Sequence, residues 1–195
     1  MDRIFVLIAN KARTSKFNLN DLPGSAGRMD IVCRFISQSL FISHGIRKNA
    51  CAYAILKGIP EPCKTIKISG RDVRYLSPDE RNIAGMINKA LSAKIDEEWR
   101  EISPGVHVSR KDVPSLLDEF SGRSIYYLRE DGDDVHDVEI SDPVFVIGDH
   151  LGVGVDDERE IIRRADGVLS LGKISYQADQ CVTILNYILD RRCEG

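Results

Sequence analysis

The order of apolar and polar positions along the chain predicts alternating strands and helices. Arg3 to Ala9 form a near-continuous apolar run, which is typical of a strand buried on both faces of a parallel sheet. Helical spacing of apolar positions begins near Arg28, with Ser25 as the expected cap, and a second helix is expected to be capped by Ser77. The other predicted strands are 51–56, 64–68, 106–108, 124–128, 143–148 and 167–171, and the other predicted helices are 112–120, 156–165 and 177–192.

This alternation predicts an α/β protein with a mostly parallel sheet flanked by helices. The 195 residues contain no internal repeat or convincing linker, so we expect a single domain over 1–195. No apolar run approaches the roughly 18 residues that a membrane helix needs. The chain enters a strand directly, without the apolar stretch and cleavage site of a secretory signal, so we expect a cytoplasmic protein that contacts no membrane.

Two kinds of loop stand out as places for chemistry. The polar stretch from Asn10 to Gly27 is long for a connection inside a compact domain, and such loops are often functional. Three strand ends in the last third of the chain lie at Leu128, at Gly148 to Gly154 and at Leu171 to Tyr176. Ligands of open α/β sheets bind beyond the carboxyl ends of strands, and glycine lets the backbone reach a ligand. Neither glycine turn has the spacing of a dinucleotide fingerprint or a P-loop.

The distribution of charge and the spacing of cysteines and histidines reduce the number of possible functions further. Residues 1–75 hold 13 Lys and Arg against 5 Asp and Glu, a net charge of +8, although the whole chain carries −3. A basic front half favours a phosphate-bearing partner, unless the two halves interleave in the fold and no patch survives. Five scattered cysteines without a C-x-x-C pair, and four histidines without metal-ligand spacing, predict no disulfide framework and no metal site.

Several segments together resemble a known family. Val146 to His150, Leu169 to Tyr176 and Ala178 to Cys181 resemble the cofactor segments of SPOUT methyltransferases, and Leu19 to Asp30 is similar to the N-terminal signature of the archaeal tRNA pseudouridine-54 N1-methyltransferases. The resemblance covers essentially the whole chain. It implies an α/β fold with a C-terminal trefoil knot, S-adenosylmethionine as cofactor, tRNA as partner and a homodimer whose cofactor sites lie near the interface.

The resemblance also implies a cofactor site on particular residues. An apolar slot with backbone hydrogen bonds suits adenine, and a neutral, carbonyl-rich lining suits the cationic sulfonium. Lys173 is the exception, because it fits better if it points outward or toward RNA. Cys181 is either a cofactor contact or a packed thiol of the last helix, and a nucleophilic role is the least expected. The implied lining is Leu128, Gly148, Leu171, Gly172, Lys173, Ile174, Ser175, Tyr176 and Cys181.

The implied reaction is attack of pseudouridine N1 on the methyl carbon. Because this nitrogen carries a proton, the reaction favours a general base. Asp21 and Asp30 are the candidates, although Asp21 also fits an Asx-type turn and Asp30 also fits a carboxylate placed at a helix N-terminus. Arg28 is the best candidate for gripping phosphate, with Arg34 and the cations at positions 11, 13 and 16 behind it.

Other functions stay open from the sequence alone. The target could instead be pseudouridine in small-subunit ribosomal RNA, or the chain could be a non-catalytic RNA-binding or assembly factor. RNA bases splayed out of a loop often stack on aromatic rings, for which Phe17 and Tyr176 are candidates if they do not belong to the core. His150 is the one histidine expected near the glycine turns.

Overall fold

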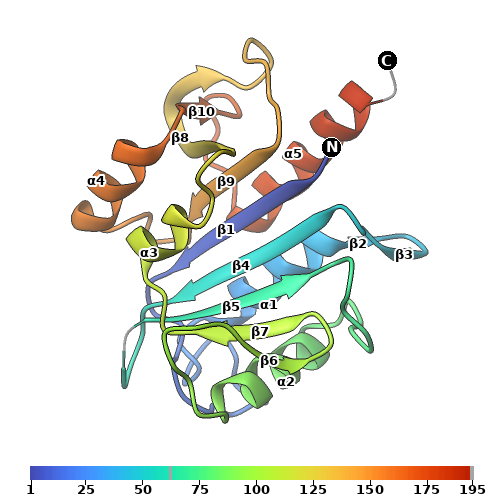
Figure 1. The fold of residues 1–195 in the computed structure, drawn as a ribbon, viewed down its shortest axis with the longest axis vertical. Coiled ribbons are helices and arrows are strands. Elements are labelled where there is room, and N and C mark those ends of the chain that lie inside the picture. The colour runs from blue at the N-terminus through green and yellow to red at the C-terminus, as the bar shows by residue number, and fades with distance from the viewer. Residues whose placement is uncertain (62, 194–195) are drawn as a thin grey trace.

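The computed structural model describes residues 1–61 and 63–193, and it is built around a continuous eight-stranded sheet (Figure 1). The strands lie in the order β10 (Gly167–Ser170), β8 (Ser124–Asp134), β9 (Pro143–Gly148), β1 (Arg3–Ala9), β4 (Ala50–Leu56), β5 (Lys64–Ser69), β7 (Val106–Ser109) and β6 (Arg100–Ser103). Neighbours are parallel from β10 to β4 and antiparallel from β4 to β6. The predicted mostly parallel α/β sheet is therefore confirmed, and its antiparallel edge was not predicted.

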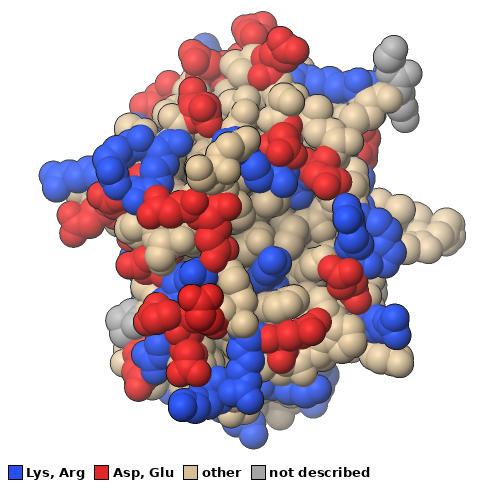
Figure 2. Space-filling view, viewed as in Figure 1, with Lys and Arg blue, Asp and Glu red and all other residues tan. Residues whose placement is uncertain are grey.

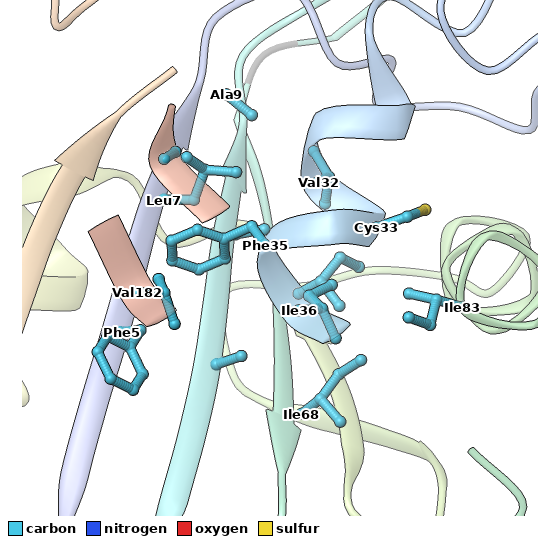
Figure 3. Packing of buried hydrophobic residues seen from close by; sticks show 14 of the residues in the cluster. Phe5, Leu7, Ala9, Val32, Cys33, Phe35, Ile36, Ile68, Ile83 and Val182 are labelled. Atoms are coloured by element: carbon cyan, nitrogen blue, oxygen red, sulfur yellow. The ribbon is translucent and has the colours of Figure 1, made fainter. Parts of the chain in front are cut away.

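Helices cover both faces of the sheet, because β1 alternates its apolar side chains between them. Phe5 and Leu7 join the core under α1 (Met29–Leu40), α2 (Glu80–Leu91) and α5 (Ala178–Cys193), whereas Val6 joins the core under α3 (Val113–Asp118) and α4 (Val155–Arg164). Figure 3 shows Phe35 of α1 and Val182 of α5 pointing toward β1. A small hairpin of β2 (Phe41–Ile42) and β3 (Gly45–Ile46) stands apart.

Three local expectations were wrong. Arg28, not Ser25, occupies the N-cap position of α1, and it does so in the left-handed conformation with φ 64° and without a side-chain cap. Asp79, not Ser77, caps α2 by accepting a hydrogen bond from the amide of Asn82. The strand predicted over 124–128 is longer than expected, because β8 continues through the acidic residues 130–134.

The pairing of β10 with β8 is interrupted in the middle. Val168 lies opposite Tyr127, but the next residue, Leu169, lies opposite Asp133, so residues 128–132 of β8 bulge out of the pairing. Gly132 makes the return possible, since a Cβ atom there would stand 2.6 Å from the carbonyl oxygen of Val168. The bulged part of β8 thus lies over the carboxyl end of β10.

The long loop between β1 and α1 is packed rather than free. Ala12, Phe17, Leu22 and Ala26 all belong to the main hydrophobic core. Gly27, with φ 68°, approaches the carbonyl oxygen of Lys11 so closely that a Cβ atom would stand 1.9 Å from it. The loop therefore delivers Arg28 to a fixed place next to the ends of β1 and β9.

The two oppositely charged halves of the chain interleave in the sheet, since β1, β4 and β5 lie between the acidic-half strands β9 and β7. On the face drawn in Figure 2, Lys and Arg atoms accordingly alternate with Asp and Glu atoms. Within 1–61 and 63–193, no helix is long and apolar enough to cross a membrane.

Candidate functional site

The bulge of β8 and the carboxyl ends of β9 and β10 meet and enclose a cavity of about 170 Å³, which we call the glycine-turn cavity. Eight of the nine predicted cofactor residues line it, and the ninth, Lys173, is exposed and does not. The structure therefore brings the predicted residues of three separate turns into one place. The full lining is 127–130, 147–149, 152–153, 169, 171–172, 174–176 and 181.

Two of the predicted glycines are required by the backbone. A Cβ atom at Gly148 would stand 2.7 Å from the carbonyl carbon of Gly152, so the turn after β9 closes only with glycine there. Gly172 has φ 108°, which other residues rarely adopt. The hydroxyl of Ser170 accepts a hydrogen bond from the amide of Gly172 at 3.0 Å and donates to the carbonyl of Glu130 at 3.1 Å. These bonds tie the turn after β10 to the bulge of β8.

Sequence reasoning missed the pair that holds the turn after β9. The carboxylate of Asp149, whose side chain is 4% exposed, accepts hydrogen bonds from the backbone and side-chain nitrogens of Asn10 at 2.7 and 2.8 Å. The Asn10 side chain also donates to the carbonyl of Gly152 at 2.8 Å. Both residues directly follow adjacent parallel strands, β1 and β9, and this position was the available signal in the sequence.

The cavity has an electrostatic bias toward cations. Glu130 and Asp149 both line it, and the hydroxyl of Ser175 donates to Glu130 at 2.6 Å, which holds the pKa of that carboxyl below its usual value. Among the described residues that line the cavity, Arg129 is the one Lys or Arg. Its guanidinium is engaged by Asp131 at 2.7 Å and by Glu158 at 3.3 Å. The lining therefore suits a positively charged ligand.

A second cavity of about 420 Å³ adjoins the first, and we call it the Arg28 cavity. The two cavities adjoin each other, because they share six lining residues: Glu130, Gly148, Asp149, Gly152, Ser175 and Tyr176. Arg28, His150, Ile31 and residues 177–179 line the Arg28 cavity but not the glycine-turn cavity. His150 thus lies near the glycine turns, as expected.

Arg28 is held in its cavity by Asp30. Its guanidinium donates two hydrogen bonds of 3.0 Å to the Asp30 carboxylate, and Arg34 donates a third of 3.0 Å. Burial would raise the pKa of Asp30, but the hydrogen bonds from the two arginines outweigh burial and lower it. Asp30 therefore stays ionised and fixes the orientation of the Arg28 guanidinium. The two parallel hydrogen bonds between them form a bidentate pair.

Asp21 lies apart from both cavities. Its carboxylate accepts hydrogen bonds from the backbone amides of Gly24 at 3.1 Å and Ser25 at 2.7 Å, and the bonds from Ser25 lower its pKa. This is the Asx-type arrangement that the sequence left open. The structure therefore brings Arg28 and Asp30 to the site and places Asp21 in the loop behind them.

Three further candidates have defined surroundings. Cys181 lines the glycine-turn cavity, and burial raises its pKa to about 11, so its thiol is protonated at neutral pH. Tyr176 lines both cavities and is 39% exposed, whereas Phe17 is 9% exposed and belongs to the core. In the described part of the chain, no group of three or more His, Cys, Asp or Glu side chains is arranged to hold a metal ion.

Comparisons with known proteins agree on one family. A family model described as "Putative SAM-dependent RNA methyltransferase" matches residues 2–193. A curated protein of Methanosarcina acetivorans, named tRNA (pseudouridine(54)-N(1))-methyltransferase, is 46% identical over 97% of this chain and 91% of its own length. Proteins of the same name from Methanopyrus kandleri and Methanocaldococcus jannaschii are 47% and 43% identical, over 96% and 98% of this chain and 92% and 99% of their own lengths.

A solved structure shares the fold. The crystal structure of Archaeoglobus fulgidus Nep1 bound to S-adenosylhomocysteine matches over 100% of both chains with a TM-score of 0.67 and 17% sequence identity. At that identity the likeness concerns the fold alone.

Proposed function

Because the chain belongs to this family of SAM-dependent RNA methyltransferases, we propose that it transfers a methyl group from S-adenosylmethionine to N1 of pseudouridine 54 in the T-loop of tRNA, in the cytoplasm. The observation that carries the proposal is that the two cavities adjoin and share six lining residues. Two reactants held in adjoining cavities meet in a fixed orientation, which contributes a large part of the acceleration of a bimolecular transfer.

The residues of the glycine-turn cavity fit the cofactor. Leu171 and Ile174 supply apolar surface and the glycine turns supply backbone groups, as an adenine ring requires. Glu130 and Asp149 bias the cavity toward the positive charge of the sulfonium, and Cys181 remains a neutral contact. When bound, S-adenosylmethionine supplies a methyl group that the attacking nitrogen receives as the carbon–sulfur bond breaks.

The residues of the Arg28 cavity fit the acceptor. Arg28 can bind a phosphate or the carbonyl oxygen of the target base, and Asp30 and Arg34 hold it in position. Tyr176 lines both cavities and can stack on the flipped ring at their junction. We propose Arg28 as a catalytic residue and Asp30 as the residue that positions it.

The proton on N1 must leave as the new nitrogen–carbon bond forms. Asp21 and Asp30 remain proposed bases, although hydrogen bonds that lower a carboxyl pKa also weaken it as a base. The engagement of both carboxylates therefore favours transfer of the proton through a water molecule. Activity of Asp21→Ala and Asp30→Ala, with donor binding measured separately, tests each role.

Two finer features of the family are also proposed for this chain. The close approach of the β8 bulge to β10, backbone against backbone at Gly132, supports a trefoil knot in the C-terminal part of a single domain over 1–195. A homodimer is supported by exposed apolar side chains that lie among or within two residues of the cavity linings. These are Leu151, Val155, Ile174 and Tyr176.

The proposed activity has a direct test. The protein is incubated with methyl-labelled donor and a tRNA transcript that carries either pseudouridine or uridine at position 54, and the modified nucleoside is identified by mass spectrometry. We expect N1-methylpseudouridine from the first RNA only. Methyl label in a small-subunit ribosomal RNA fragment but not in tRNA would identify ribosomal RNA as the substrate instead. Binding of RNA without methyl label in either RNA would identify a non-catalytic RNA-binding factor.

A further inference from the structure

The edge of the sheet opposite the two cavities carries a second basic surface. Lys48 precedes β4, while Arg71 and Arg74 follow β5, so all three lie at the amino ends of β1 and β4. Together with Asp72, Val73, Glu101 and Pro104 they line a cavity of about 700 Å³. At about 3.3 Å per residue, the seven residues of β1 separate this edge from the cofactor edge by about 20 Å.

The positive charge of this surface is available. In the part of the chain that the structure describes, Lys48 and Arg74 are exposed and form no ion pair, and Arg71 has only a long contact of 3.6 Å with Asp2. The cavity also holds two acidic residues, which leaves its lining with a net charge of +1, and neutral donors orient both carboxylates. Asp72 accepts from the hydroxyl of Ser69 at 2.8 Å, and Glu101 accepts from the amide of Gly105 at 3.0 Å.

An exposed aromatic ring stands next to these cations in the chain. Tyr75 is 87% exposed, the highest value among the large apolar and aromatic side chains exposed in the described residues, and its φ of 61° is uncommon for a residue with a side chain. The side-chain amide of Asn82 donates to its carbonyl at 3.5 Å and accepts from the amide of Ser77 at 2.9 Å. A strained backbone that presents a ring to solvent indicates a binding role rather than a packing role.

The loop that carries these side chains is anchored from below. Val73 and Leu76 are buried in the main core, and the amide of Gly70 donates to the carbonyl of Ala50 at 2.9 Å. A Cβ atom at Gly105 would stand 2.4 Å from the amide nitrogen of Val73, so the β6–β7 turn closes tightly against the loop. Along the right-hand edge of Figure 2, Lys and Arg atoms lie near the β2–β3 hairpin and the segment that follows β5.

We propose that Lys48, Arg71, Arg74 and Tyr75, here named the Tyr75 platform, form a second contact surface for the RNA substrate. The cations bind phosphates and the ring stacks on one unpaired base, the combination that single-stranded nucleic acid requires. This inference rests on the proposed function for its choice of RNA. Since the platform lies about 20 Å from the cofactor edge, it reads parts of the RNA well outside the target loop.

The test compares a full-length tRNA transcript with a minimal T-loop hairpin closed by two base pairs, using fluorescence anisotropy. Tyr75→Asn removes the ring but tolerates the positive φ, and it is expected to raise the dissociation constant for tRNA about ten-fold and leave that for the hairpin unchanged. Tyr75→Phe retains the ring and is expected to bind as the wild type does. Tyr187→Ala, which removes another exposed tyrosine on α5, is the matched control and is expected to change neither constant.

The charged part of the platform has its own readout. The double variant Lys48→Gln/Arg74→Gln is expected to weaken tRNA binding and to reduce the slope of log affinity against log salt by about one to two. Arg159→Gln on α4 is the control, expected to leave the slope unchanged. Melting temperatures and donor binding by calorimetry, expected to match the wild type, show that each variant is folded.

The outcomes separate this inference from the proposed function. If the wild type methylates tRNA but the Tyr75 and Lys48/Arg74 variants bind it as tightly as the wild type, the platform is overturned and the function stands. If the wild type produces no methylated nucleoside yet binds tRNA through the platform, the function fails and the platform stands. If the wild type binds no RNA, both are overturned.

Discussion

At the scale of single residues, the site depends on short polar contacts between segments far apart in sequence. Asn10 reaches across 139 positions to bind Asp149, and Arg28 is aimed by Asp30 from the same helix start. The hydrophobic pattern of the sequence predicts neither contact. Asn10 and Asp149 look like ordinary loop residues until the pairing of β1 with β9 is known. Arg28 and Asp30 were found because they lie within a family signature.

The Asn10 contact is expected to matter for the cofactor. Asn10→Ala removes the side-chain donor to Asp149 and the donor to Gly152, which loosens the turn that lines both cavities. Hydrogen bonds to charged groups contribute about 1.5–3 kcal/mol each. We expect the dissociation constant for S-adenosylmethionine, measured by calorimetry, to rise at least ten-fold. Asn49→Ala, which removes an exposed bond to the carbonyl of Met1, serves as control and should leave it unchanged.

The Asp30 cluster is expected to give the protein a pH-dependent stability. The pKa of Asp30 is lowered in the folded state, so its ion pairs stabilise the fold above the unfolded value of about 4, and this contribution is lost as the pH falls through the folded value. Asp30→Asn should lower the free energy of unfolding by about 2 kcal/mol at pH 7, since the carboxylate is buried but its arginines are half-exposed.

Urea titrations at pH 7 and pH 3 measure this difference for the wild type and Asp30→Asn. The gap between them should shrink at pH 3. An equal gap at both pH values would show that the cost comes from packing rather than from the charge.

At the scale of elements, the interrupted pairing of β8 with β10 builds the cofactor edge. The bulge of β8 carries Leu128, Arg129 and Glu130 into the cavity, and the tight return at Gly132 places that bulge over the end of β10. A regular pairing along the whole of β8 would have left these residues in the plane of the sheet. The irregularity is therefore part of the site.

Gly132→Ala tests that return. The new methyl group would stand 2.6 Å from the carbonyl oxygen of Val168, and forcing extra atoms into a packed interior costs about 1–3 kcal/mol. We expect a melting temperature several degrees lower and weaker donor binding. Gly85→Ala is the opposite control, because its Cβ meets nothing within 4 Å inside α2, and it should stabilise the protein by about 0.5–1 kcal/mol.

The sequence predicted helices and strands correctly where the apolar pattern is long. The predictions were wrong where contacts between distant segments decide the local structure. The buried strands β1, β4 and β9 stand out because both of their faces are apolar. The strand β6, with its exposed Arg100 and Glu101, has no such pattern and forms only because β7 pairs with it. The acidic part of β8 reads as a loop for the same reason, since its pairing with β10 and not its composition makes it a strand.

At the scale of the whole molecule, the site was predictable because a parallel sheet gathers strand ends. The bulge of β8 and the two glycine turns after β9 and β10, separated by up to about forty residues in sequence, line one cavity, since the three strands run in the same direction. The charge asymmetry of the two halves did not predict a single basic face, because the halves interleave in the sheet. The location of the basic surface at Lys48, Arg71 and Arg74 depends on the antiparallel edge, which the sequence did not indicate.

The proposed dimer is tested at this scale. Leu151 is 53% exposed beside the cavity lining, and Leu151→Asp would bury a charge in the proposed interface, so sedimentation should show a shift from dimer to monomer. Ile42→Asp changes a similarly exposed residue on the β2–β3 hairpin and should leave the sedimentation unchanged. A wild type that sediments as a monomer at micromolar concentration would contradict the dimer itself.

The bulge of β8 over β10 also bears on how the protein comes into being. Residues 169–181 supply part of the cofactor cavity, and they reach their places only when β10 has paired with β8. A nascent chain whose last two elements are still inside the ribosomal exit tunnel therefore has no complete pocket for the methyl donor.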